Sequence, residues 1–341
     1  MAASTATRSL TPEFRTHDFR IAPDLAGLRV DQALARALPQ YSRARLHSWI
    51  EAGAVQVDGQ VPRPRDRVNG GEQVRIEAQL EPETRVAAEK MPLDVVHKDR
   101  GIFIINKPAG MVVHPGAGNP SHTLQNALLA LDPKLALVPR AGLVHRLDKD
   151  TSGLMVVART PEAHAALVAA ISERRVERAY LAVCLGVMTS GGTVDEPIGR
   201  HRLQRVRMAV RTDGREAVTH YRVIKRYRGH TLVRAELETG RTHQIRVHLA
   251  HIGFPLVGDP VYGGRRRIPR GATDGLMTAL DSFKRQALHA TRLALEHPLT
   301  GRKLEFEAPL PADMAALIAA LEADAKAGDA DQARVARRRG R

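Results

Sequence analysis

An aspartate in a charged turn is the residue of this sequence best placed to do chemistry. Residues 142–153 read Gly-Leu-Val-His-Arg-Leu-Asp-Lys-Asp-Thr-Ser-Gly, and apolar runs on both sides predict two buried strands joined by this turn. Asp148 lies between Arg146 and Lys149, and the two cations favour its ionised carboxylate. Turns held by a rigid sheet commonly carry catalytic groups. The alternative is an aspartate that only forms ion pairs in a turn.

The sequence does not satisfy the usual motifs of metal-binding and cofactor-binding sites. Residues 148–159 superficially match a calcium loop, but Arg159 stands where that loop needs a glutamate. A phosphotransferase aspartate is a distant option, because two polar residues separate Asp148 from the apolar strand. The histidines of residues 243–251 lack the glutamate and the spacing of a zinc motif. A carboxylate, arginines and a tyrosine remain, which suit chemistry on a nucleotide without metal or cofactor.

Composition and charge point to an anionic partner. The 341 residues suffice for one large and one small folded unit. Lys and Arg total 52 against 37 Asp and Glu, a formal charge of +15, which favours nucleic acid, although charge can also serve solubility alone. No apolar stretch approaches the ~20 residues of a membrane span, and residues 1–7 lack the apolar region of a signal peptide. The single cysteine, Cys184, excludes an intrachain disulfide and a cysteine-based zinc site, so we expect a cytoplasmic protein.

Residues 26–80 predict a small separate domain. Two short amphipathic helices precede a small sheet, and this stretch resembles the S4-like RNA-binding module. Arg43 and Arg45 on the second helix are expected to contact RNA phosphates, the alternative being an ordinary solvated face. We expect residues 1–25 to form a flexible arm and residues 81–92, with two prolines, to form a linker.

The larger domain is expected over residues 93–325. Its apolar segments alternate between strand and helix periods, and the arginine-rich residues 191–215 predict a basic hairpin that tracks phosphate, or else a solvated loop. A helix is expected from about residue 312 to 325. Residues 326–341 are predicted to be a disordered basic tail.

Five spaced motifs resemble those of the RNA pseudouridine synthases of the large-subunit type. Residues 145–153 are similar to the catalytic motif of that family. The other four motifs lie at residues 106–110, 178–180, 238–251 and 258–263, and all five occur in the order that the family has them. With the S4-like module, the resemblance covers about residues 19–320. It implies an α+β fold with a central mixed, largely antiparallel sheet and flanking helices. It also implies an enzyme that detaches uracil from C1′ of a ribose in RNA, turns it and rejoins it through C5, with no cofactor.

The resemblance assigns roles to three catalytic residues. Asp148 is the essential aspartate, either as a nucleophile or as the base that removes a ribose proton. Tyr180 stacks on the uracil and helps to remove the C5 proton. Arg246 pairs with Asp148 and holds it ionised and aimed.

The same resemblance implies residues that touch the RNA and a target. Arg146 enters the space left by the flipped base, Ile245 lines the base pocket, and Arg241 contacts RNA. The closest motifs imply 23S ribosomal RNA, free or in a large-subunit precursor, at the stem-loop called helix 69, with no membrane and no obligate protein partner. A family member acting at another large-subunit site or on tRNA is the nearest alternative. An inactive RNA-binding ribosome-assembly factor is the alternative from another class.

Overall fold

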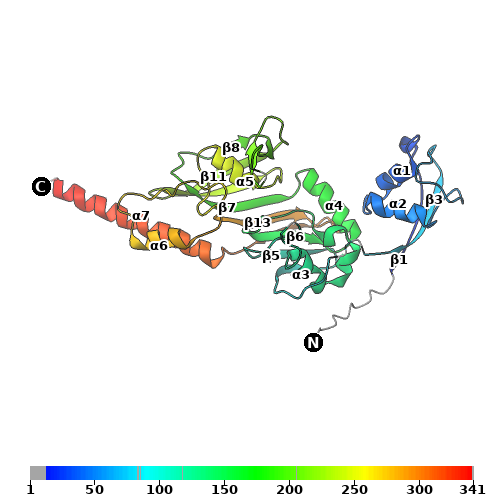
Figure 1. The fold of residues 1–341 in the computed structure, drawn as a ribbon, viewed down its shortest axis with the longest axis horizontal. Coiled ribbons are helices and arrows are strands. Elements are labelled where there is room, and N and C mark those ends of the chain that lie inside the picture. The colour runs from blue at the N-terminus through cyan, green and yellow to red at the C-terminus, as the bar shows by residue number, and fades with distance from the viewer. Residues whose placement is uncertain (1–12, 83, 85, 117, 205, 340–341) are drawn as a thin grey trace.

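The computed structural model describes residues 13–82, 84, 86–116, 118–204 and 206–339, which form a small and a large unit. In Figure 1 the small unit lies at one end of the molecule and helix α7 projects from the other, with the long sheet between them. Within the part of the chain that the structure describes, no helix is long and apolar enough to span a membrane.

The small unit packs two helices against a three-stranded antiparallel sheet of order β1-β3-β2. Ser42 caps the second helix by accepting a hydrogen bond from the backbone N–H of Arg45. The third strand buries every second residue, as expected for a strand with one face on a core. The elements are β1 (Glu13–Arg20), η1 (Pro23–Leu25), α1 (Val30–Ala37), α2 (Arg43–Glu51), β2 (Val55–Val57) and β3 (Gln73–Leu80).

The prediction of a flexible arm over residues 1–25 is wrong for its second half. Strand β1 pairs with β3 along its whole length, from Glu13 opposite Leu80 to Arg20 opposite Gln73. Its sequence is mostly polar, so its conformation depends on a partner about 60 residues away rather than on local preference. Residues 1–12 lie outside the described residues. The small unit therefore begins before residue 26, at β1.

The large unit is built on one mixed, largely antiparallel sheet, as predicted. Its order is β4-β5-β6-β13-β7-β12-β11-β8, with β14 beside β13, and the described β13–β6 pair is parallel. The strands are β4 (Asp94–Lys98), β5 (Ile102–Lys107), β6 (Ser152–Ala158), β7 (Glu177–Leu185), β8 (Gly192–Asp195), β11 (Val218–Arg226), β12 (His230–Leu237), β13 (Leu288–Glu296) and β14 (Lys303–Glu307).

Helices cover both faces of this sheet, which explains why its central strands are apolar throughout. Phe103 and Ile105 of β5 share one core with helices α3 and α5, whereas Ile102 and Ile104 share another with α4. A third core holds α6 and α7 against the far end of β7. The helices are α3 (Leu124–Leu131), α4 (Pro161–Ser172), α5 (Gln244–His251), α6 (Asp274–Ser282) and α7 (Ala312–Arg339).

Two further segments test the predictions for the basic regions. Strands β9 (Ile198–Arg200) and β10 (Met208–Val210) pair antiparallel, so the basic residues 191–215 do contain a hairpin. The prediction of a disordered tail over residues 326–341 is wrong up to residue 339, because α7 continues to Arg339. Alanine and arginine dominate this stretch, and both favour helix strongly.

Two glycines fix the path of the segment that carries Asp148. Gly142 (φ +80°) and Gly153 (φ +116°) stand at its two ends in conformations that other residues rarely adopt. A Cβ on Gly153 would lie 2.2 Å from the carbonyl oxygen of Ala290 on β13. The turn therefore enters β6 where the backbones of β6 and β13 lie too close together for a side chain at position 153.

We expect the Gly153→Ala substitution to lower the free energy of unfolding by at least about 3 kcal/mol, because it forces a backbone clash at a positive φ. Gly110→Ala is the control: its φ is also positive (+85°), but a Cβ there meets no atom within 4 Å, so a loss of about 1 kcal/mol is expected. Urea unfolding followed by circular dichroism measures both. Equal losses would show that β13 does not constrain Gly153.

Candidate active site

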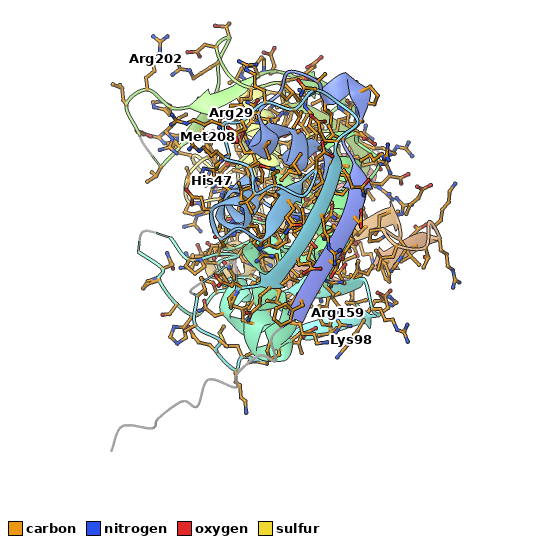
Figure 2. All side chains as sticks on the ribbon, turned by 90° about the vertical axis from the view of Figure 1, so that its right-hand side faces the viewer. Arg29, His47, Lys98, Arg159, Arg202 and Met208 are labelled. Carbon is orange, nitrogen blue, oxygen red and sulfur yellow. The ribbon has the colours of Figure 1, made fainter. Side chains whose placement is uncertain are left out.

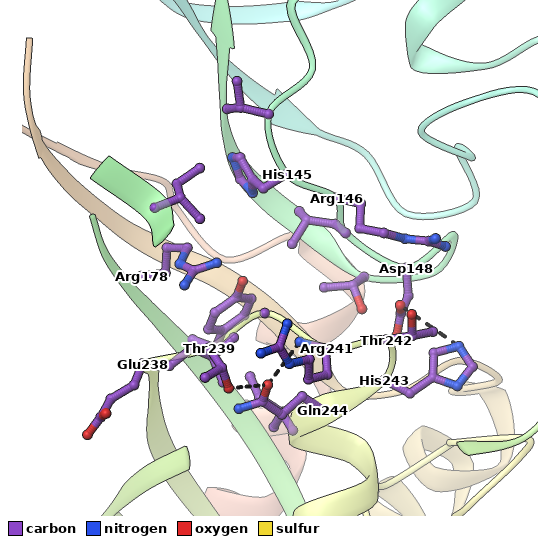
Figure 3. Close-up of a pocket in the computed structure, with 18 of the residues that line it drawn as sticks. His145, Arg146, Asp148, Arg178, Glu238, Thr239, Arg241, Thr242, His243 and Gln244 are labelled. Carbon is purple, nitrogen blue, oxygen red and sulfur yellow. Dashed lines mark hydrogen bonds and ion pairs between the residues drawn. The ribbon is translucent and has the colours of Figure 1, made fainter. Parts of the chain in front are cut away.

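A cleft of about 510 Å³ opens on the sheet face that carries α5. Its walls come from three segments far apart in sequence: the turn before β6, the start of β7, and the connection from β12 into α5 (Figure 3). Seven arginines line it: Arg140, Arg146, Arg174, Arg178, Arg215, Arg241 and Arg246. Three carboxylates, those of Asp148, Glu216 and Glu238, also line the cleft, so its lining carries a surplus of positive charge.

Arg246 joins Asp148 to a second, fully buried carboxylate. Its Nη1 donates to Asp148 Oδ2 at 2.9 Å, while its Nε and Nη2 donate to Asp259 Oδ2 and Oδ1 at 2.7 and 2.9 Å. Burial alone would lower the pKa of Arg246, but the two carboxylates raise it above its usual value. Burial alone would raise the pKa of Asp259, but Arg246 holds it below its usual range. Arg246 and Asp259 are thus both charged at neutral pH, and Asp148 Oδ1 is left to face the cleft.

The backbone on the far side of Asp148 is also fixed. Lys107 is fully buried at the end of β5, and its Nζ donates to the carbonyl oxygens of Lys149 (3.0 Å), Pro108 and Met111. Burial lowers the pKa of Lys107 to about 7. Arg285 Nη1 donates to the carbonyl oxygen of Asp150 at 3.1 Å. The turn is therefore held through its main-chain oxygens, whereas the Asp148 side chain is held by Arg246.

A histidine connects Asp148 to the basic hairpin. His243, at φ +58°, places Nε2 3.9 Å from Asp148 Oδ1 and Nδ1 2.9 Å from the Tyr262 hydroxyl. That hydroxyl accepts from the backbone N–H of Met208 at 2.8 Å, so its own proton is donated to His243 Nδ1. Burial lowers the pKa of His243 even though Asp148 opposes this shift, and the neutral ring carries its proton on Nε2, towards Asp148.

Tyr180 lies in the floor of the cleft. It is 5% exposed and stands on β7 opposite Ala235 of β12 and Ala290 of β13. Burial raises the pKa of its phenol, and the positive charge of Arg178 opposes that shift. Two small neighbours and a buried ring provide a flat apolar surface, which suits stacking against a planar base.

The structure brings six of the eight predicted site residues together. Asp148, Tyr180 and Arg246 share the cleft with the three residues predicted to touch RNA or the base: Arg146, Ile245 and Arg241. Arg146 is exposed at the rim, and Ile245 is buried beside the cleft. Arg241 donates from Nε to the carbonyl oxygen of Glu216 at 2.8 Å.

The other two predicted residues lie on the small unit, away from the cleft. The Arg43 side chain is 66% exposed. The prediction that Arg45 faces solvent is wrong: it is 8% exposed, and its guanidinium donates to the carbonyl oxygens of Leu137 and Glu81. Leu137 belongs to the large unit and packs into the core of the small one. Arg45 therefore lies at the joint between the two units.

Sequence reasoning missed four residues of the site: Lys107, Arg178, Asp259 and Tyr262. Each stood inside a recognised motif but was given no role. Asp259 had a usable signal, because an acid in a loop of glycine, proline and apolar residues needs a cation nearby. Among the described residues no group of three or more His, Cys, Asp or Glu side chains could hold a metal ion.

Comparison with known proteins identifies similar chains over nearly the whole length. A family model described as RNA pseudouridylate synthase matches residues 101–251, and one described as S4 domain matches residues 28–74. Proteins named ribosomal large subunit pseudouridine synthase D are 55% identical over 305 residues in Xanthomonas campestris pv. campestris (89% of this chain, 92% of that one) and 56% identical over 299 residues in Escherichia coli K12 (87% and 92%). The solved structure of human RNA pseudouridylate synthase domain containing 4 is 28% identical, with a TM-score of 0.53 over 67% of this chain and 93% of that one.

We expect Asp259→Asn to lower the free energy of unfolding by about 3 kcal/mol or more, because it removes the buried carboxylate that accepts two hydrogen bonds from the buried Arg246 guanidinium. The control is Asp213→Asn, which breaks an ion pair to Arg211 whose aspartate is 63% exposed; there little or no loss is expected. Thermal or urea unfolding measures both. Similar small losses for the two variants would show that Asp259 does not anchor Arg246.

Proposed function

The chain belongs to the RNA pseudouridylate synthase family, and we propose that its substrate is 23S ribosomal RNA, modified at the stem-loop called helix 69. The protein is an RNA pseudouridine synthase, an isomerase that converts uridine in RNA to pseudouridine. The names of the relatives support the large ribosomal subunit as the target, and the motif resemblance supports the particular stem-loop. With a ribosomal substrate, we place the protein in the cytoplasm.

The observation that carries this proposal is the Asp148–Arg246–Asp259 chain at the centre of a cationic cleft. In the reaction the N1–C1′ bond breaks, its electron pair leaves with the uracil, and C5 of the turned base then bonds to C1′ and loses its proton. Asp148 assists either by attacking C1′ or by removing a ribose proton. Arg246 occupies Oδ2, so Oδ1 is the oxygen that we expect to react.

Access to the base requires it to leave its stack. Arg146 is exposed at the rim two residues before Asp148, where its side chain can fill the space that the flipped uridine leaves. Tyr180 then stacks on the base and helps to remove the C5 proton, while Ile245 closes the pocket. These assignments combine the family resemblance with the positions of the side chains around one cleft.

The remaining RNA is expected to contact the hairpin and the small unit. Figure 2 shows Arg202 of the hairpin on the same side of the molecule as Arg29 and His47 of the small unit, and Lys98 and Arg159 on the other side. The exposed Arg43 belongs to the helix that S4-like modules lay against RNA. Arg202 and Arg29 on the same side of the molecule support an RNA-binding surface that runs from the small unit to the hairpin beside the cleft.

We expect Asp148→Asn to abolish pseudouridine formation while RNA affinity stays within about threefold, because Arg246 keeps its pair with Asp259 and the fold is preserved. Turnover on a helix 69 stem-loop and filter binding measure the two quantities. Asp150→Asn removes the same charge two residues away and should leave turnover near that of the wild type. Turnover of Asp148→Asn within tenfold of the wild type would contradict the mechanism.

The target is tested by mapping pseudouridine across total RNA from cells that lack this protein. We expect the modification to disappear from the helix 69 loop and to return with the wild-type gene but not with Asp148→Asn. If pseudouridine disappears instead from another large-subunit site or from tRNA, that site is the target and helix 69 is not. An unchanged map, together with a ribosome-assembly defect that Asp148→Asn corrects, would favour an RNA-binding assembly factor.

A further inference from the structure

Arg178 is a buried cation at the cleft whose charge the protein leaves without a counter-ion. It is 6% exposed, and its Nε has no hydrogen-bond partner. Among the residues that the structure describes, no hydrogen bond or ion pair of the Arg178 side chain is found. An isolated buried charge is costly, and buried polar groups are paired almost without exception. An Arg178 that lines a cleft is therefore expected to find its partner in what the cleft binds.

The surroundings of Arg178 leave room for its guanidinium, and no carboxylate of the described residues forms an ion pair with it. A Cβ on Gly240 would lie 3.0 Å from Arg178 Nη1, so the missing side chain leaves room for the group. His145 lies near enough that burial and the charge of Arg178 lower its pKa to about 3. Its Nε2 accepts from the backbone N–H of Val156 at 3.0 Å, as a neutral ring does.

Four other arginines of the cleft differ from Arg178 in how their charge is compensated. Arg246 has two carboxylates, and Arg174 pairs with Glu216 and Glu238. Arg140 and Arg215 are exposed to water. Arg178 combines deep burial with an uncompensated charge, which separates it from the cations that serve RNA phosphates at the rim.

Strand geometry aims Arg178 at the same place as Tyr180. The two residues are two apart on β7, so their side chains leave the sheet on the same face. Figure 3 shows Arg178 and Asp148 on opposite sides of the pocket. A uridine whose ribose lies against Asp148 and whose base lies on Tyr180 therefore extends its uracil towards the Arg178 guanidinium.

We propose that Arg178 donates hydrogen bonds to a carbonyl oxygen of the flipped uracil and stabilises the negative charge of the base while it is detached. When the N1–C1′ bond breaks, the electron pair passes to the uracil and spreads onto O2 and O4. It is used again when C5 bonds to C1′; the C5 proton is then removed with the help of Tyr180, and N1 of the base takes up a proton, so the product has the same atoms as uridine. A fixed cation in a site with little water is effective because the charge appears only after the bond breaks. The proposal rests on the uridine-binding role given to this cleft above.

The test measures binding and single-turnover rates for Arg178→Gln and Arg178→Lys on a helix 69 stem-loop. We expect Arg178→Gln to slow uridine conversion about 10²- to 10³-fold with a Kd within about threefold, as found when one preorganised donor to a developing anion is removed. Arg178→Lys keeps the charge and should recover at least tenfold of that loss. Arg175→Gln is the control, since it removes an arginine that pairs with Glu173 outside the cleft: its Kd and its rate should stay near those of the wild type.

A second substrate separates charge stabilisation from a structural role. In 5-fluorouridine the fluorine withdraws electrons, so the detached base carries its negative charge more easily and needs the cation less. We expect Arg178→Gln to slow consumption of a 5-fluorouridine stem-loop at least tenfold less than it slows conversion of the uridine stem-loop.

Three results would overturn the proposal. Equal slowing of both substrates, with a lower melting temperature and no recovery in Arg178→Lys, would make Arg178 structural. A raised Kd with an unchanged rate would make it a phosphate contact. A normal rate and a normal Kd in Arg178→Gln would remove it from the site altogether. Failure of the wild-type protein to convert the stem-loop would instead contradict the proposed function.

Discussion

The site depends on Arg246, one guanidinium shared between two carboxylates. Asp259, which is fully buried, takes the Nε and Nη2 edge, and Asp148 takes the remaining Nη1. A buried arginine with one carboxylate partner is balanced in charge, so the second carboxylate brings a negative charge that the rest of the cleft must compensate. The surplus of arginines around Asp148 follows from this need as well as from RNA binding.

The sheet makes this arrangement possible because it brings distant segments to one place. Asp148 precedes β6, Tyr180 is on β7, and Arg246 is on α5, which packs on the face that Tyr180 occupies. The parallel contact of β6 with β13 is close enough to require Gly153, and it sets where the turn begins. Lys107 then holds the turn through its main chain, so the Asp148 side chain is positioned without being buried.

Local patterns in the sequence predicted much of this arrangement. Features that depend on contacts between distant parts of the chain were not predicted. The turn at Asp148 was recognisable because charge interrupts two apolar strands, and the mixed sheet and the six cleft residues followed from the family motifs. Strand β1 and the burial of Arg45 depend on partners far away in the chain, which periodicity does not report. Helix periodicity places Arg45 only relative to α2, whereas its burial comes from Leu137 of the other unit. Arg178 could not be predicted for the same reason, because what sets it apart is the lack of a carboxylate partner in the folded chain.

The arginines of the cleft fall into groups that the chemistry of the reaction explains. Exposed ones, such as Arg146, remain hydrated and can contact phosphates or enter a base stack at small cost. Arg246 is charged and fully compensated before substrate binds, so it orients Asp148 without competing for the substrate. Arg178 has no carboxylate partner among the described residues, and a neutral uracil would satisfy its hydrogen bonds but not its charge. A detached uracil anion would satisfy both, so a buried, unpaired cation favours the state after bond cleavage over the bound substrate.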